Sequence, residues 1–167
     1  MLVLGVDPGS HVTGYGLVEK TGREIMICVD SGHITSPKNT PFYERVYYIF
    51  QAMVELMNRY HPQEMAIEDI FYAKNIQSSL KLGHARGAVL IAAVQCGVRI
   101  FEYTPLEIKQ SVVGYGRATK EQVRSMVQVI LKLKLKTRLK LDTSDALATA
   151  ICHLNRSKFE KLVSGKT

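Results

Sequence analysis

The first third of the chain has an apolar pattern that predicts three β-strands. Residues 2–6 form a short apolar run closed by Asp7-Pro8-Gly9, which is typical of a buried strand that ends in a tight turn. A second β-rich run follows a short polar link, so we expect the two runs to pair as a hairpin. Residues 24–34 alternate between apolar and polar, which predicts a third strand with one buried face. The alternating apolar residues there are Ile25, Ile27 and Val29.

The remainder of the chain alternates helical periodicity with short strands. Residues 46–60 carry apolar side chains at three- and four-residue spacing, which predicts a helix with one apolar stripe. Thr40 can cap this helix, Pro41 suits its first turn, and His61-Pro62 should end it. Further helices are expected at residues 78–95, 105–113, 119–131 and 146–155, and further strands at residues 65–67 and 98–103. This order of elements indicates an α/β domain with a mixed sheet.

Composition and charge narrow the class of protein. The 167 residues suit one domain, which we place at residues 1–156, followed by a basic and flexible tail at residues 157–167. The formal net charge of +7 favours an anionic partner, and nucleic acid is the commonest. The three cysteines form neither a disulfide framework nor a metal-ligand pattern, which suits a reducing compartment. We recognise no signal peptide and no membrane-spanning apolar run, so we expect a cytoplasmic protein without membrane contact.

Four carboxylates lie at the ends of predicted elements and are the candidate chemistry. Asp7 and Glu68 each follow a short apolar strand, and Asp142 and Asp145 are spaced to share one face at the start of the last helix. Gathered carboxylates repel one another, and hard divalent cations such as Mg²⁺ relieve that repulsion. Two such ions can activate a water and stabilise the leaving oxygen in phosphodiester hydrolysis. The sequence therefore predicts an acidic, metal-binding site in a basic protein, with Lys and Arg side chains holding phosphates.

Each carboxylate also has an ordinary structural interpretation. Asp7 could cap its own Pro-Gly turn, and Glu68-Asp69 could end a strand in solvent. Asp142 is a good N-cap residue, and Asp145 would be favoured in the first turn by the helix dipole. These interpretations stay open for each acid taken singly.

Several segments in order along the chain resemble the RuvC family of Holliday junction resolvases. The first is Gly-Val-Asp-Pro-Gly-Ser at residues 5–10 with Thr-Gly-Tyr-Gly at residues 13–16, and the last is Asp-Thr-Ser-Asp-Ala-Leu-Ala at residues 142–148. The segments between them are Ala-Ile-Glu at 66–68, Phe-Tyr-Ala-Lys-Asn at 71–75, Leu-Lys-Leu-Gly at 80–83, Ala-Arg-Gly at 85–87 and Lys-Gln-Ser-Val-Val-Gly at 109–114. The resemblance extends over roughly residues 1–155.

This resemblance implies an RNase H-like fold, with a five-stranded mixed sheet flanked by helices. It implies a homodimeric endonuclease that makes paired symmetric nicks in a four-way DNA junction and works with the RuvA–RuvB branch-migration complex. It assigns catalysis and the binding of Mg²⁺ or Mn²⁺, with two ions per site, to Asp7, Glu68, Asp142 and Asp145. It assigns DNA contacts to Phe71, Lys74, Arg86, Lys109 and Lys120, and a part in the dimer interface to the helix at residues 78–95.

Three kinds of protein other than this resolvase family remain to be weighed. A YqgF-like nuclease shares the fold and the strand-end acids, but residues 71–75 and 109–114 favour the resolvase. A junction-binding module without catalysis would be expected to lack an acid. An actin-like or Hsp70-like ATPase, which the first hairpin also resembles, needs two such domains and a second phosphate loop.

Two features of the C-terminal third remain open at this point. The segment from Lys132 to Lys140 alternates Leu with Lys or Arg, and it fits a frayed helix end, a solvated basic segment or an extra strand. It also lacks a proline that relatives often carry just before the last motif. We expect His153, on the last helix, to pack in the core or to support the site indirectly.

Overall fold

A computed structural model describes residues 1–22, 25–69, 75–133 and 139–163. The described residues form a five-stranded sheet in the order β3-β2-β1-β4-β5. Strand β2 is antiparallel to both of its neighbours, β1 and β3, whereas β4 runs parallel to β1 and β5 runs parallel to β4. The strands are β1 (Leu2–Asp7), β2 (Val12–Thr21), β3 (Ile25–Thr35), β4 (Glu64–Glu68) and β5 (Arg99–Tyr103). The predicted hairpin and the mixed sheet are confirmed.

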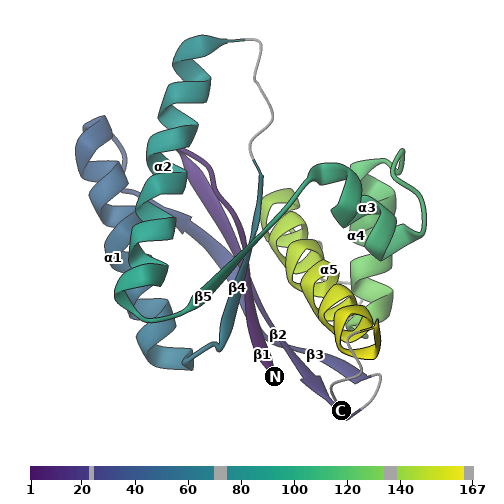
Figure 1. Cartoon of the computed structure of the whole chain (residues 1–167). Coiled ribbons are helices and arrows are strands. Elements are labelled where there is room, and N and C mark those ends of the chain that lie inside the picture. Colours follow the sequence, from purple (N-terminus) through teal and green to yellow (C-terminus); the bar gives the residue numbers. More distant parts are fainter. Residues whose placement is uncertain (23–24, 70–74, 134–138, 164–167) are drawn as a thin grey trace.

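Helices cover both faces of this sheet (Figure 1). They are α1 (Phe42–Tyr60), α2 (Ile76–Gln95), α3 (Pro105–Val113), α4 (Lys120–Ile130) and α5 (Leu141–Val163). Helices α1 and α2 bury apolar side chains on one face, around Leu4, Met53 and Ile67. Helix α5, backed by α3 and α4, buries the opposite face, around Leu147 and Ile151. The alternation of strand residues between two apolar layers explains why residues 2–6 of β1 and residues 65–67 of β4 are apolar without alternation.

The third strand exists, but its buried face is not the predicted one. Ile25, Ile27 and Val29 are 44–57% exposed. Met26 and Cys28, which alternate with them, pack against the core on the α5 side. Strand β3 is the last strand of the sheet on its side, and the face that carries Ile25, Ile27 and Val29 is open to solvent.

Two helix boundaries differ from the prediction. Pro41 occupies the N-cap position of α1 and not its first turn, and the Thr40 hydroxyl donates to the Pro37 carbonyl instead of capping the helix. Helix α5 begins at Leu141 and runs to Val163, so it is longer at both ends than residues 146–155. It therefore includes residues 157–163, which we had expected to belong to a flexible tail.

The segment from Lys132 to Lys140 is described only at its ends. Leu133 and Leu139 pack partly against the core on the α5 side. The Lys140 ammonium lies 2.8 Å from Nε2 of His33, at the end of β3. The choice between helix end, basic segment and strand falls on residues 134–138, which lie outside the described residues.

No described helix is both long enough and apolar enough to cross a bilayer.

Candidate active site

The sheet brings Asp7 and Glu68 to one edge. Each ends its strand, and the two strands are parallel neighbours with Val6 opposite Ile67. The carboxyl ends of adjacent parallel strands lie side by side, so the two carboxylates meet at the same edge. This is the position at which ligands bind in open α/β sheets.

Glycines let the first turn of α5 lie directly on this edge. A Cβ atom built at Gly14 would lie 2.1 Å from the carbonyl oxygen of Asp142, and one at Gly5 would lie 2.0 Å from the carbonyl oxygen of Ala146. Gly14 is paired with Asp7 across the β1–β2 ladder. The helix backbone therefore rests on the sheet backbone at the level of Asp7, and this contact carries Asp142 to the strand-end acids.

Burial and mutual repulsion act strongly on Asp7. Its pKa is raised from 3.8 to about 8, first by burial and then by the charges of Glu68, Asp145 and Asp142. The pKa of Glu68 is raised as well, first by burial and then by Asp145. All four predicted acids therefore belong to one electrostatic cluster, and Asp7 stands at its centre.

Two lysines oppose this repulsion. The Lys120 ammonium donates to a carboxylate oxygen of Asp145 at 3.0 Å, and this contact raises the pKa of Lys120. Lys109 and Lys120 both lower the pKa of Glu68. A pocket of about 120 Å³ is lined by Glu68, Asp145 and both lysines, with apolar side chains behind them. The structure thus brings two of the five predicted DNA contacts to the acids.

Comparison with known proteins matches nearly the whole chain. The sequence model described as "Crossover junction endodeoxyribonuclease RuvC" matches residues 3–153. The RuvC of Geobacter metallireducens is 45% identical over 98% of this chain and 98% of the relative. The chain belongs to the RuvC family.

Other relatives and solved structures agree with this assignment. The RuvC of Ruminiclostridium cellulolyticum is 42% identical over 98% of this chain and 97% of the relative. The structure of T. thermophilus RuvC in complex with a Holliday junction substrate superimposes with a TM-score of 0.89, at 34% identity over 96% of both chains. The yeast mitochondrial resolvase Ydc2 shares the fold, with a TM-score of 0.66 at 10% identity.

The acids suit a hard divalent cation by their chemistry. Among the described residues, no three His, Cys, Asp or Glu side chains are gathered tightly enough to enclose an ion as they stand. The four carboxylates nevertheless offer only oxygen ligands, and they repel one another in the way that Mg²⁺ or Mn²⁺ relieves. An ion at Asp145 would compete with Lys120 for the same carboxylate.

The other three predicted DNA contacts are Phe71, Lys74 and Arg86. Phe71 and Lys74 lie outside the described residues. Arg86 of α2 has its guanidinium occupied: it pairs with Glu102, lies 3.9 Å from Asp69 and donates to the Glu68 carbonyl oxygen at 3.4 Å. Arg86 therefore ties α2 to the ends of β4 and β5, and its role as a DNA contact stays a prediction.

Sequence reasoning missed how the site is held together. It treated Gly5 and Gly14 only as parts of a family motif, although the backbone of α5 packs directly against both glycines. It also missed the bond from the Thr143 hydroxyl to the Gly32 carbonyl oxygen at 3.1 Å, which fixes the first turn of α5 to β3. The signal available in the sequence was the presence of a glycine in each of the first two strands, Gly5 and Gly14, near Asp7.

Replacing Lys120 with alanine should slow cleavage of a four-way junction by about 10- to 100-fold. The change removes the cation nearest Asp145 and increases the repulsion at Asp7 and Glu68. Arg59→Ala makes the same charge change in an exposed residue at the far end of α1, and we expect it to cleave at the wild-type rate. Single-turnover cleavage with saturating enzyme measures the rates of the two variants. Equal rates would show that Lys120 has no part in cleavage.

Proposed function

We propose that this chain is a structure-selective endonuclease that cuts four-way DNA junctions by hydrolysing phosphodiester bonds at Asp7, Glu68, Asp142 and Asp145. The observation that carries the proposal is the electrostatic coupling of these acids at one sheet edge, with Lys109 and Lys120 beside them. The relative whose structure fits best among those named above was solved with a Holliday junction substrate. Family membership also supports a thymine-containing cleavage site and cooperation with the RuvA–RuvB complex.

The carboxylates and the lysines of the site have different roles because of their opposite charges. The four carboxylates would hold divalent cations and orient the water that attacks phosphorus. Bound ions, which we propose to be two Mg²⁺ per site, would supply the Lewis-acid chemistry that activates this water and stabilises the leaving oxygen. Lys109 and Lys120 are placed to hold the negative phosphate against the acids, which would otherwise repel it. The products would be 5′-phosphate and 3′-hydroxyl ends.

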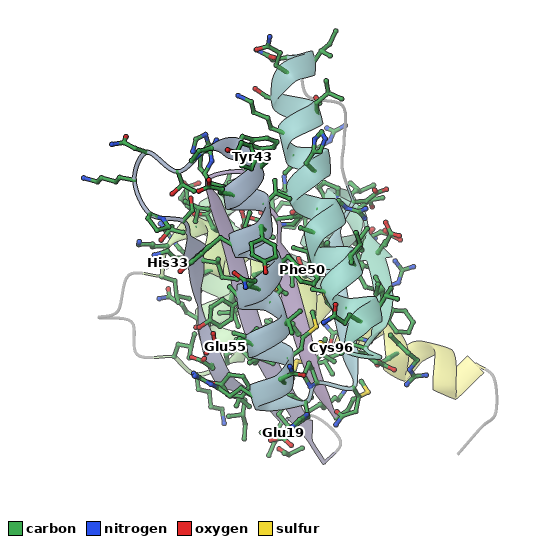
Figure 2. All side chains as sticks on the ribbon, turned by 90° about the vertical axis from the view of Figure 1, so that its left-hand side faces the viewer. Glu19, His33, Tyr43, Phe50, Glu55 and Cys96 are labelled. Atoms are coloured by element: carbon green, nitrogen blue, oxygen red, sulfur yellow. The ribbon has the colours of Figure 1, made fainter. Side chains whose placement is uncertain are left out.

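A junction with two-fold symmetry needs two such sites, and the structure offers a surface for pairing. Helices α1 and α2 lie side by side and present exposed apolar side chains, with Tyr43 and Phe50 on the face toward the viewer in Figure 2. A groove of about 710 Å³ lies between the helices. Contiguous apolar surface of this kind marks interaction sites. The exposed apolar residues on these two helices are Tyr43, Tyr47, Tyr48, Ile76, Leu80, Ile91 and Val94.

Two glycines of α2 support the approach of a second copy at this groove. A Cβ atom built at Gly83 or Gly87 meets nothing within 4 Å, so neither glycine is needed for packing inside the described chain. Glycine costs helix stability relative to alanine. Close approach of another helix would explain its presence at both positions, and we propose that the partner is the second subunit of a homodimer.

Ile91→Arg should turn the dimer into a folded monomer at micromolar concentration. The side chain is 62% exposed, so the substitution leaves the core intact but places a charge in the proposed interface. Val129→Arg on α4 is the matched control, since Val129 is 65% exposed and distant in the fold from α2. Analytical ultracentrifugation should give a monomer only for Ile91→Arg. A dimer for both variants would place the interface elsewhere.

Substrate choice tests the proposed function itself. A synthetic mobile four-way junction, a linear duplex and an RNA–DNA hybrid of matched sequence are incubated with the wild type and Mg²⁺. The proposal predicts paired nicks at symmetric positions in the junction, with little cutting of the other two. Equal cleavage of all three would indicate a general nuclease of the same fold, and tight junction binding without nicks would indicate a binding module.

A further inference from the structure

A buried polar chain crosses the apolar layer between α5 and the sheet, away from the acids. His153 of α5 is only 2% exposed, and its Nε2 lies 2.5 Å from a carboxylate oxygen of Glu64. Its Nδ1 lies 2.7 Å from the hydroxyl of Tyr103 on β5. The other Glu64 oxygen accepts from Arg99 at 2.5 Å. Each polar atom of the histidine ring therefore has a partner.

The surroundings of this chain are apolar. Glu64 is 6% exposed, and the ring of Phe101 lies 4.4 Å from the histidine ring, centroid to centroid. A buried pair of this kind adds little net stability, because removing the groups from water costs about as much as their attraction returns. Its best-attested use is to fix which of several packings is adopted.

The same two elements carry this pair and the acids. Strand β4 begins at Glu64 and ends at Glu68, about 13 Å apart at 3.3 Å per residue. On α5, Asp145 and His153 are eight residues apart, or about 12 Å at 1.5 Å per residue. Glu64 and Glu68 lie on one face of the strand, and Asp145 and His153 lie along one row of the helix. The buried pair thus stands at one end of the contact and the acids at the other.

Several contacts of α5 with β1, β2 and β4 are made by small residues. The helix rests on Gly5 and Gly14 of the sheet through the backbone of its first two turns. Between the two ends lie Ala66 of β4 and Thr149 of α5, both without exposed area. Small residues permit close approach but provide few interlocking side chains. The bond from Thr143 to Gly32 ties the first turn of α5 to β3, and the Glu64–His153 bond adds a directional contact with β4 further along the helix.

We propose that the Glu64–His153 pair is a positioning device that sets where α5 lies along β4 and thereby the spacing of Asp145 from Glu68. The proposal rests on the proposed function, because it takes these two acids as metal ligands. Glu64 and His153 are both buried and stand at the opposite end of the contact from the acids. Their effect reaches the site through the placement of the helix.

A double substitution separates positioning from stability. Glu64→Met with His153→Phe replaces both side chains with apolar ones of similar shape and slightly larger volume, and removes the directional bond between α5 and β4 at this point. Arg99 is largely exposed and returns to solvent. We expect a folded protein with near wild-type thermal stability. The single variant His153→Phe leaves Glu64 buried without its histidine, so it should be the less stable of the two.

Metal binding is the first measurement, since it does not depend on turnover. Titration calorimetry with Mn²⁺, without DNA, should show about tenfold weaker binding for the double variant than for wild type. Single-turnover junction cleavage at the wild-type Mg²⁺ optimum should fall by about tenfold and recover in part at higher Mg²⁺. Junction affinity without metal should be unchanged.

Tyr60→Phe is the matched control. It removes a 2.7 Å hydrogen bond to Asp30, between α1 and β3, without touching α5. We expect wild-type Mn²⁺ binding from it. A double variant with wild-type Mn²⁺ affinity and cleavage would overturn the proposal, as would equal losses in Tyr60→Phe.

The outcomes also separate this proposal from the proposed function. A wild type that binds Mn²⁺ but cuts no junction would overturn the nuclease assignment, and weaker Mn²⁺ binding in the double variant would still support positioning. A wild type that binds no Mn²⁺ would overturn both.

Discussion

An Asp7→Asn variant should lose junction cleavage by about three orders of magnitude or more and, without metal, should be more stable than wild type. The loss follows because Asp7 stands at the centre of the coupled acids. The gain follows because asparagine is neutral, so the cost of burying a charge and the repulsion from Glu68, Asp145 and Asp142 both disappear. Opposite effects on activity and stability are typical of a residue retained for function.

The gain in stability should depend on pH in a defined direction. The pKa of Asp7 is about 8 in the folded protein and near 3.8 in the unfolded chain. Between these values the folded state holds a proton that the unfolded state releases, so the metal-free wild type loses stability as pH rises from about 4 to 8. Asp7→Asn lacks this titration, and its advantage should therefore widen over the same range.

Thermal unfolding in EDTA at pH 5 and pH 8 measures this difference. Asp7 keeps some contact with solvent, so we expect on the order of 1–3 kcal/mol at pH 8, or about 3–10 °C. Glu19→Gln on β2 makes the same change of acid to amide away from the site and should have little effect at either pH. A variant that still cleaves, or one whose advantage shrinks as pH rises, would contradict the electrostatic account.

Gly14→Ala should reduce cleavage by at least about 100-fold and destabilise the protein by about 2–4 kcal/mol. The added methyl group would lie 2.1 Å from the Asp142 carbonyl oxygen, so either α5 or β2 must move. Because Asp142 stands in the first turn of α5, this movement draws it away from Asp7.

Gly16→Ala is the graded comparison for this test. Its Cβ atom would meet the side chain of Leu147 at 2.6–2.7 Å, and a side chain can shift more easily than a helix backbone. Chemical denaturation and single-turnover cleavage should show a stability loss in both variants but a large loss of cleavage only in Gly14→Ala. Equal cleavage by the two variants would show that the contact of Gly14 with the α5 backbone does not determine the position of the acids.

The strands and the acids at their ends could be predicted because each depends on a short, continuous stretch of sequence. An apolar run that ends in Asp7 or Glu68 reports a buried strand and its end without knowledge of the rest of the fold. The face of β3 could not be predicted in this way, because alternation alone does not say which of two apolar-containing faces a helix will cover. Ile25 and Met26 are neighbours on β3 and point to opposite faces of the sheet, and only the face of Met26 packs against the core on the α5 side.

The partners of individual side chains were also beyond local reasoning. Arg86 and Glu102 are 16 residues apart, and Glu64 and His153 are 89 residues apart, so neither contact leaves a periodic signal. The prediction that His153 packs in the core is confirmed, but its bond to Glu64 is visible only once α5 lies on the sheet. The same holds for Gly14, whose role depends on the helix above it.

The most direct test of the metal site is to locate ions in crystals. Crystals of the wild type with a four-way junction, grown with Mn²⁺, would be measured at an energy where manganese scatters anomalously. The account predicts anomalous peaks within bonding distance of the carboxylates of Asp7, Glu68, Asp142 and Asp145, with Lys120 displaced from Asp145. Peaks absent from these acids, with the Lys120–Asp145 pair intact, would contradict a metal-dependent nuclease site at this edge of the sheet.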